Sequence, residues 1–381
     1  MSKDAPLASK LKEGRVARGL SISELADIIG ISRQSVSKYE SGLSIPSADV
    51  FYKIMQTLQL PLAFFLVADK YEINNDGMMY FRSLKSADRK SLDMSEIRTL
   101  WMKKIYRELT RYIKFPSTNL PDISNEYLKD EYKIEDIEKI TSMLREFWKL
   151  GNGPIDNLTY TLEKNGIIVT RIGIESTKID AFSKWIDEDR LICFLGTNKN
   201  CAVRSRFDLA HELGHAVLHK CLDQMDLYDP KKLKRIEKEA NMFASAFLLP
   251  HSSFGSEIMS TSLQHFVLLK ERWKVSIQAM IYRCHELGYL SDDQTLYLRK
   301  KIVKSGIREN EPLDDKIEIE RPSAIRQSVE LLLNNKLIDK KSLIDIVNIP
   351  VEELEELLTL AEGTLKDNAK ILNIDFRNNI K

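Results

Sequence analysis

The feature that most constrains this chain is the run Arg206-Phe-Asp-Leu-Ala-His-Glu-Leu-Gly-His-Ala-Val-Leu-His219, which contains two histidines four residues apart. On a helix, His211 and His215 lie one turn apart on the same face, where two imidazoles can bind one Zn²⁺. Glu212 follows the first histidine, so its carboxylate can accept a proton from a water at the open position of the metal. The spacing therefore predicts a buried helix that carries the H-E-x-x-H site of a metallopeptidase.

A catalytic zinc ion needs a third protein ligand, and the next predicted helix offers a carboxylate. Residues 236–250 have apolar side chains at helical spacing and end at a proline. Glu237 and Asn241 share one face of that helix, so we expect Glu237 to bind the metal and Asn241 to hydrogen-bond a ligating histidine. Glu239 remains the alternative ligand, although it points about 160° away from Asn241, given 100° per residue.

His219 continues the four-residue series but is not expected to be a ligand. It lies roughly 12 Å from His211 along the helix axis, so both imidazoles cannot reach one ion. We assign it a supporting or structural role next to the ligands. The alternative to a metal site is a chance match to H-E-x-x-H. Such a match is expected in about 1 in 100 chains of this length and histidine content.

Three segments together resemble the ImmA/IrrE family of metallopeptidases: residues 179–183 (Ile-Asp-Ala-Phe-Ser), residues 206–215, and residues 237–250 with Glu-Lys-Glu-Ala-Asn-Met-Phe-Ala and Leu-Leu-Pro. The resemblance covers about residues 83–302. It implies that His211, His215 and Glu237 bind zinc and that Glu212 is the general base. It also implies a protein substrate, a repressor or an antitoxin-like protein, because family members with known roles cleave a partner repressor.

The N-terminal region has the pattern of a helix-turn-helix. A capping box opens a helix at Ser21, Gly30 permits a tight turn, and Ser32 caps a second helix over residues 33–40. In such a motif the second helix lies in the major groove of DNA. We expect its exposed polar side chains to contact base edges and phosphates, namely Arg33, Gln34, Ser37 and Lys38. A small helical bundle that binds protein is the alternative.

Residues 8–68 strongly resemble the Xre-family, lambda-repressor-like helix-turn-helix domain through the run Leu-Ser-Ile-Ser-Glu-Leu-Ala…Gly-Ile-Ser-Arg-Gln-Ser-Val-Ser-Lys-Tyr-Glu-Ser-Gly. The resemblance implies five helices and a double-stranded DNA operator. A homodimer is expected because such domains bind paired half-sites. Arg15 and Arg18 of the first helix are expected to contact phosphate.

Composition narrows the class of protein without identifying it. The formal net charge is +1, so overall electrostatics select neither nucleic acid nor a membrane. The 4 cysteines have no C-x-x-C spacing and are expected to be reduced thiols. No stretch reaches the roughly 18 apolar residues that a membrane-spanning helix needs, and the N-terminus has no apolar signal segment. We therefore expect a cytoplasmic protein.

The expected fold is mainly α with a small β-sheet, an α+β architecture. We predict a DNA-binding domain over 8–68, a connector over 69–86, a zincin-like peptidase domain over 87–302 and a C-terminal helical region over 303–381. Helices are expected at about 88–114 and 134–150, the first assigned to the peptidase domain or, alternatively, to dimerisation of the DNA-binding domain. Three β-rich runs, 166–171, 181–186 and 191–195, predict an antiparallel sheet over the metal helix, whose edge would hold an extended substrate. Residues 308–316 read as a charged linker.

These features predict a DNA-binding transcriptional regulator that carries a zinc-dependent peptidase. Its substrate is expected to be a repressor, an antitoxin-like protein or the chain itself. The alternative is a non-proteolytic Xre-family transcription factor or antitoxin, in which the metal site is structural or acts as a sensor.

Overall fold

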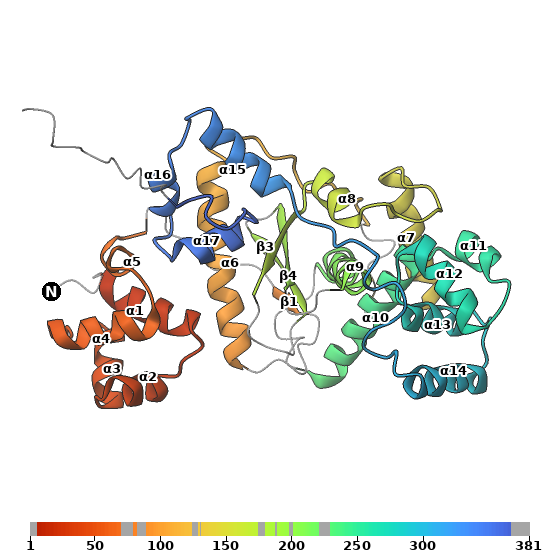
Figure 1. The fold of residues 1–381 in the computed structure, drawn as a ribbon, viewed down its shortest axis with the longest axis horizontal. Coiled ribbons are helices and arrows are strands. Elements are labelled where there is room, and N and C mark those ends of the chain that lie inside the picture. Colours follow the sequence, from red (N-terminus) through yellow and green to blue (C-terminus); the bar gives the residue numbers. More distant parts are fainter. Residues whose placement is uncertain are drawn as a thin grey trace, which may run out of the picture.

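The computed structural model describes residues 6–69, 79–81, 89–123, 129, 131–173, 180–186, 189–197, 201–220 and 229–366. Helices surround a small central sheet, with the N-terminal helices at one end of the molecule and α11 to α14 at the other (Figure 1). The predicted fold class, mainly helical with a small sheet, is confirmed. Within these residues no helix is long and apolar enough to cross a membrane.

Five helices form the N-terminal region, and their ends follow the predicted caps. The Ser21 side chain accepts a hydrogen bond from the Glu24 N–H, the Glu24 carboxylate accepts one from the Ser21 N–H, and Gly30 ends the same helix at φ 74°. The Ser32 side chain accepts from the Ser35 N–H. The helices are α1 (Pro6–Ala17), α2 (Ile22–Ile29), α3 (Arg33–Glu40), α4 (Ala48–Leu58) and α5 (Leu62–Leu66).

The sheet has four strands in the order β1-β3-β4-β2. The strands are β1 (Met79–Phe81), β2 (Ile168–Ile172), β3 (Ala181–Ile186) and β4 (Arg190–Gly196). The prediction of a purely antiparallel sheet is wrong, because β2 pairs with β4 in parallel. The chain crosses from β2 to β3 before it turns back into β4, so β2 and β4 run the same way. The strand β1 lies inside the predicted connector and pairs with β3.

Alternate residues of a strand point to opposite faces of the sheet, and here both faces lie against a hydrophobic core. Val169, Cys193 and Leu195 belong to the core that includes the metal helix α9 (Ala202–Leu218). Ile168 and Phe194 belong to the core on the other side, which α6 (Arg89–Leu109) shares. Figure 1 shows α6 and α9 on opposite sides of the strands. The sheet therefore separates α9 from the N-terminal and C-terminal helices.

The metal helix is packed between the sheet and α10 (Pro230–Leu248). Gly214 permits close contact between the two helices, because a Cβ at this position would lie 3.0 Å from the Phe243 ring. The remaining helices on this side are α7 (Ile134–Phe147), α8 (Leu158–Lys164), α11 (His251–Phe254), the short 3₁₀ helix η2 (Gly255–Glu257), α12 (Leu263–Trp273), α13 (Ile277–Glu286) and α14 (Asp292–Lys304). The helices predicted at 88–114 and 134–150 end earlier in the structure, as α6 and α7.

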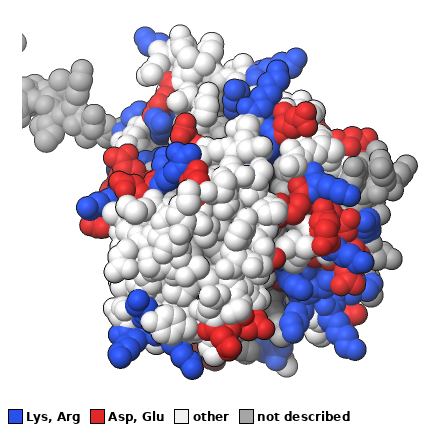
Figure 2. Space-filling view, turned by 90° about the vertical axis from the view of Figure 1, so that its right-hand side faces the viewer, with Lys and Arg blue, Asp and Glu red and all other residues white. Residues whose placement is uncertain are grey.

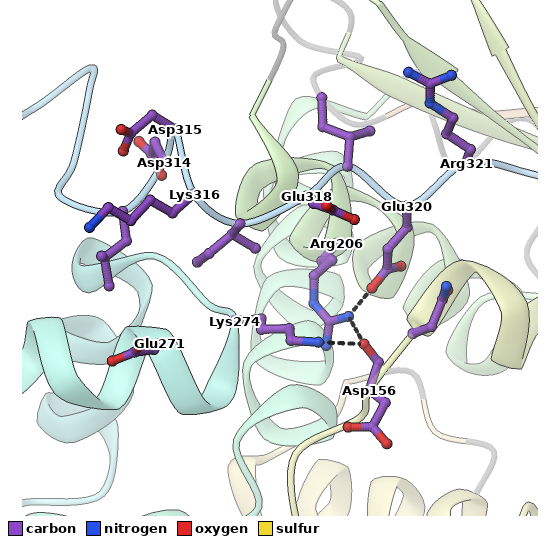
Figure 3. Close-up of a pocket in the computed structure, with 14 residues that line it drawn as sticks. Asp156, Arg206, Glu271, Lys274, Asp314, Asp315, Lys316, Glu318, Glu320 and Arg321 are labelled. Carbon is purple, nitrogen blue, oxygen red and sulfur yellow. Dashed lines mark hydrogen bonds and ion pairs between the residues drawn. The ribbon is translucent and has the colours of Figure 1, made fainter.

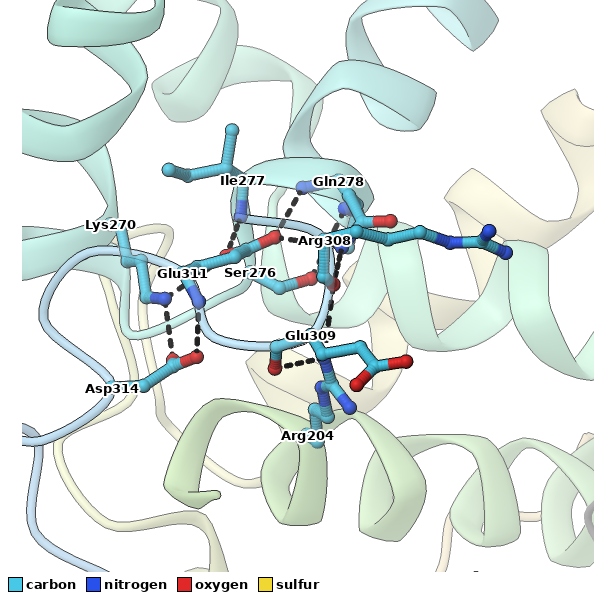
Figure 4. A network of polar contacts seen from close by, with 10 residues as sticks. Arg204, Lys270, Ser276, Ile277, Gln278, Arg308, Glu309, Glu311 and Asp314 are labelled. Atoms are coloured by element: carbon cyan, nitrogen blue, oxygen red, sulfur yellow. Dashed lines mark hydrogen bonds and ion pairs between the residues drawn. The ribbon is translucent and has the colours of Figure 1, made fainter. Parts of the chain in front are cut away.

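The segment predicted as a charged linker is instead fixed to the helices beside it. We call residues 308–322 the strap. Its buried Glu311 accepts hydrogen bonds from Lys270 Nζ at 3.0 Å and from the Ile277 N–H at 2.7 Å, while Asp314 accepts one from Lys270 at 2.6 Å (Figure 4). These contacts cap α13 and neutralise a buried lysine. After the strap come α15 (Ala324–Asn334), α16 (Lys340–Ile344) and α17 (Val351–Leu357).

The helix α6 contacts both the N-terminal helices and the sheet side of the molecule. Trp101 Nε1 donates a hydrogen bond to Glu13 Oε1 at 2.7 Å, and Lys104 Nζ lies 2.8 Å from Asp69 Oδ1. This helix thus links the predicted DNA-binding domain, 8–68, to the predicted peptidase domain, which was expected to begin at residue 87. The boundary itself remains a prediction.

The two arginines expected on DNA phosphates have protein partners. Arg15 forms a two-point ion pair with Glu40, at 2.6 and 2.9 Å. Arg18 Nη2 lies 2.6 Å from Glu353 of α17. Both guanidinium groups therefore have partners within the chain, and their contact with DNA phosphates stays a prediction.

Candidate metal centre

Two histidines and a carboxylate converge between α9 and α10. His211 and His215 are fully buried, and Glu237 reaches them from the adjacent helix. One ligand atom of each residue lies within 4.8 Å of the other two. The Nε2 atoms are 3.0 Å apart, and the Glu237 oxygens lie 3.6 Å from His211 Nε2 and 3.4 Å from His215 Nε2.

These separations fit one tetrahedral zinc ion. Bonds of about 2.0–2.1 Å at tetrahedral angles place neighbouring ligand atoms about 3.3 Å apart. The three separations lie on either side of that value. Two imidazole nitrogens and a carboxylate oxygen also form the donor set of a catalytic zinc site, with a fourth position left for water or substrate. The described residues therefore provide the ligands such an ion needs.

A hydrogen bond to Asn241 orients the first histidine. The Asn241 amide donates from Nδ2 to the Glu237 carbonyl at 2.8 Å, so its oxygen faces His211 Nδ1 at 3.1 Å. That oxygen only accepts, so His211 carries its proton on Nδ1. Its Nε2 lone pair is then available to a metal, as expected for a histidine ligand fixed by a neighbouring amide.

The second histidine is oriented through a chain of two contacts. His219 Nε2 lies 2.9 Å from Glu239 Oε2, and a carboxylate accepts the proton of that nitrogen. Burial lowers the pKa of His219 to about 4, so its ring is neutral and its Nδ1 accepts from His215 Nδ1–H at 3.0 Å. His215 Nε2 is thereby left unprotonated. Glu239, the alternative ligand considered from sequence, lies against His219 and outside the group of three.

The motif glutamate Glu212 is fully buried and has a partner that the sequence reading missed. Ser183 Oγ of β3 donates a hydrogen bond to Glu212 Oε2 at 2.6 Å. Ser183 is also fully buried, in a strand whose other residues are apolar except for Lys184. A serine inside a predicted buried strand is the signal that would have pointed to it, since a buried hydroxyl needs a partner.

Beside this pair, Cys193 is a neutral thiol. Burial raises its pKa well above the ordinary value, and the Glu212 carboxylate raises it further. A thiol held in this state is a poor metal ligand and a poor nucleophile. Cys193 belongs to the apolar core beside Glu212.

The four residues predicted to contact DNA lie on α3, away from the metal group. Arg33, Gln34, Ser37 and Lys38 are all exposed, whereas Val36 on the same helix is buried in the N-terminal core. In Figure 1, α3 is at the edge of the molecule and the sheet and α6 lie between it and α9. The two sites are therefore separate surfaces of one chain.

Comparison with known proteins agrees with both regions. Residues 162–285 match the IrrE N-terminal-like domain family of peptidases, and residues 11–65 match the helix-turn-helix family. An HTH-type transcriptional regulatory protein of Methanocaldococcus jannaschii is 46% identical over 52 residues, which are 14% of this chain and 16% of that protein. One from Pyrococcus horikoshii is 45% identical over 53 residues, 14% of this chain and 17% of that protein.

The chain thus matches only about a sixth of the length of each of these relatives. The peptidase match includes the three candidate ligands and the motif glutamate. The chain carries a helix-turn-helix domain and an IrrE/ImmA-like peptidase domain in one polypeptide.

Proposed function

We propose that this protein is a cytoplasmic DNA-binding regulator that hydrolyses a peptide bond in a partner repressor or antitoxin-like protein, with the help of a zinc ion. The observation that supports this proposal most strongly is the convergence of His211, His215 and Glu237 next to Glu212. The contacts of each histidine favour the tautomer with an unprotonated Nε2. Metal binding alone would not need a buried carboxylate beside the ligands.

The chemistry divides between the ion and the side chains. When bound, Zn²⁺ polarises a carbonyl and makes water more acidic. Glu212 takes the proton of the attacking water and then delivers it to the leaving amine. The hydrogen bond from Ser183 orients this carboxylate.

The sheet edge beside the site is relevant to how a substrate binds. Tyr80 of β1 pairs with Ser183 of β3, so the edge of β3 is already used by the chain's own strand. An extended substrate that adds to this side would pair with β1 or displace it. The sequence predicted that the edge of the sheet holds an extended substrate. With β1 paired to β3, we propose that the substrate pairs with β1 or takes its place.

On the DNA side, we propose that α3 enters the major groove of a double-stranded operator and that Arg33, Gln34, Ser37 and Lys38 make the contacts. Their exposure on one helix supports this assignment. A homodimer would match paired half-sites.

The decisive experiment compares zinc-loaded wild type with Glu212→Gln. Each is incubated with purified candidate repressors encoded beside its gene, with and without a chelator. We expect wild type to cleave one of them only in the presence of metal, and we expect Glu212→Gln to keep zinc and DNA binding but lose cleavage by at least 10²-fold, the lower range for a general base. Cleavage by Glu212→Gln at the wild-type rate would refute the role of this glutamate.

A second candidate is a transcription factor whose metal group is structural or acts as a sensor. The complete burial of His211, His215 and Glu212 favours it, because a protein substrate must reach these atoms. In that case chelation would change operator binding or the melting temperature, and zinc-loaded wild type would cleave none of the candidates.

A further inference from the structure

We propose that a cavity separate from the metal group binds a small phosphorylated molecule. The cavity lies where β2 ends, between the strap, α15 and the turn after α17, and has a volume of about 560 Å³. That volume is within the usual range for small-molecule sites, roughly 300–1,000 Å³. We call it the arginine cavity because Arg171, Arg321 and Arg326 line it from three separate elements.

Two polar groups that line the arginine cavity are buried without a partner. Among the residues that the structure describes, neither Arg171 Nη1 nor Thr359 Oγ1 has a hydrogen bond. A buried donor left unsatisfied is costly, and more so when the group is charged, so native proteins seldom keep one without a reason. A ligand that accepts hydrogen bonds would satisfy both groups after small side-chain rotations.

Among the described residues, two of the guanidinium groups that line the cavity have no counterion. Arg326 pairs with Glu330 at 3.3 Å, and the Glu356 carboxylate accepts a hydrogen bond from the Gly173 N–H. No ion pair to Arg171 or Arg321 occurs in the described part of the chain. Burial, and secondly the charge of Arg321, lowers the pKa of Arg171, so the two cations are close enough to repel each other.

Arg321 lines both the arginine cavity and the neighbouring cavity, in which Arg206 contacts Glu320 and the Asp156 carbonyl (Figure 3). Arg321 takes no part in these contacts of Arg206. Its charge acts on Arg171, which also lines the arginine cavity.

The backbone at Thr359 is held in an unusual conformation. Its φ is 54°, in the left-handed region that a β-branched residue rarely adopts. Such strain tends to occur at functional sites, where the surrounding structure compensates for it. Here the strained turn holds a residue with an unpaired hydroxyl against the cavity.

The ligand class follows from these groups together. Guanidinium groups bind phosphate with two parallel hydrogen bonds, and a dianionic phosphate balances two of them. Apolar side chains complete the lining, namely Ile319, Pro322, Leu360 and Ala361. They provide contact area for a compact organic group. A phosphate monoester meets both requirements, whereas a metal cation would be repelled.

The cavity is in contact with elements that reach both proposed activities. The strap contacts the metal helix through Glu320 and Arg206, and α17 contacts the DNA-binding region through Glu353 and Arg18. A molecule bound there would touch the strap and the turn after α17. The cavity is thus in contact with elements that lead to the candidate metal group and to the DNA-binding region.

The test measures binding to the full chain by calorimetry at constant ionic strength. The probes are inorganic phosphate and glycerol 3-phosphate, with succinate as a dicarboxylate and chloride as the ionic control. We expect both phosphates to bind, and glycerol 3-phosphate to bind more tightly. Arg321→Gln should weaken its binding by at least about tenfold, the loss expected for a hydrogen bond to a charged group.

The matched control is Arg89→Gln, which removes the same charge at a position where the side chain is 80% exposed. It should bind like wild type. Arg171→Gln is the second variant, and it should fold, because it removes an unsatisfied buried charge. No binding of either phosphate, equal binding by succinate, or unchanged affinity in both arginine variants would overturn the proposal. None of these measurements depends on cleavage, so the proposed peptidase can fail independently.

Discussion

At the scale of single residues, the metal group depends on side chains that do not touch the metal position. Glu239 is buried, accepts hydrogen bonds from His219 and from the Tyr132 N–H, and lies 3.6 Å from Arg235 Nε. Through His219 it holds His215 in one tautomer. Such outer partners usually change metal affinity when they are removed.

We predict that Glu239→Gln lowers the affinity for zinc by about 10–100-fold, the range for outer partners of a metal site. The amide has no charge to stabilise the His219 Nε2–H, so His215 is less firmly oriented. Competition with a fluorescent chelator measures the change. Glu237→Gln is the comparison, and it should lose more, since it removes a ligand. Equal affinity in Glu239→Gln and wild type would contradict the role given to Glu239.

At the scale of elements, the contact between α9 and α10 places Glu237 beside the histidines. The absence of a side chain at Gly214 lets the Phe243 ring lie against the α9 backbone. Phe243 is fully buried, so it has little room to move. The glycine of the H-E-x-x-H motif therefore limits how closely the helix of the two histidines and the helix of Glu237 approach each other.

We predict that Gly214→Ala lowers both the stability of the protein and its affinity for zinc. The new methyl group would lie 3.0–3.1 Å from three atoms of Phe243, and overpacking of this kind costs about 1–3 kcal/mol. The higher helix propensity of alanine stabilises the variant by at most about 1 kcal/mol, which offsets only part of this cost. Thermal unfolding without metal measures the first effect and zinc titration the second. A variant with unchanged zinc affinity would show that the helix contact does not set the ligand distances.

At the scale of the whole molecule, the DNA-binding region is fixed to the rest of the chain by ion pairs. Glu353 of α17 contacts Arg18 of α1 at 2.6 Å and Arg98 of α6 at 2.5 Å. Burial raises the pKa of Glu353, but the hydrogen bond from Arg18 and the charges of both arginines outweigh burial and lower it overall. A carboxyl with a lowered pKa stabilises the folded contact above its unfolded pKa and loses that effect as the pH falls through the folded value.

We predict that acidification below the ordinary glutamate pKa of about 4.3 loosens the contact between the DNA-binding region and α17. Small-angle scattering would record this as a rise in the radius of gyration. Glu353→Gln should show the larger radius already at pH 7. Glu352→Gln is the matched control, because its side chain is 59% exposed and pairs with Lys366 on the surface. A Glu353→Gln protein as compact as wild type would argue against this ion pair.

Local patterns in the sequence were enough to predict the helices, their caps and the candidate site residues. Ser21, Gly30 and Ser32 set helix ends through contacts within a few residues, and the four-residue spacing of His211 and His215 determines a shared face. The roles of His211, His215, Glu237 and Glu212 remain predictions. What the structure adds is that His211, His215 and Glu237 meet within one small volume and that Glu212 accepts a hydrogen bond from Ser183.

The sequence by itself thus determined which residues share a helix face, because helix geometry depends on neighbours three or four positions away. Only the tertiary structure decided the pairing of β2 with β4 in parallel, the addition of β1, the hydrogen bond from Ser183 and the place of Glu239 against His219. Only the tertiary structure also decided the position of the strap. Its charged residues predict a solvated linker, but Glu311 pairs with the buried Lys270. These contacts join residues far apart along the chain, and no local periodicity records which distant partner each will meet.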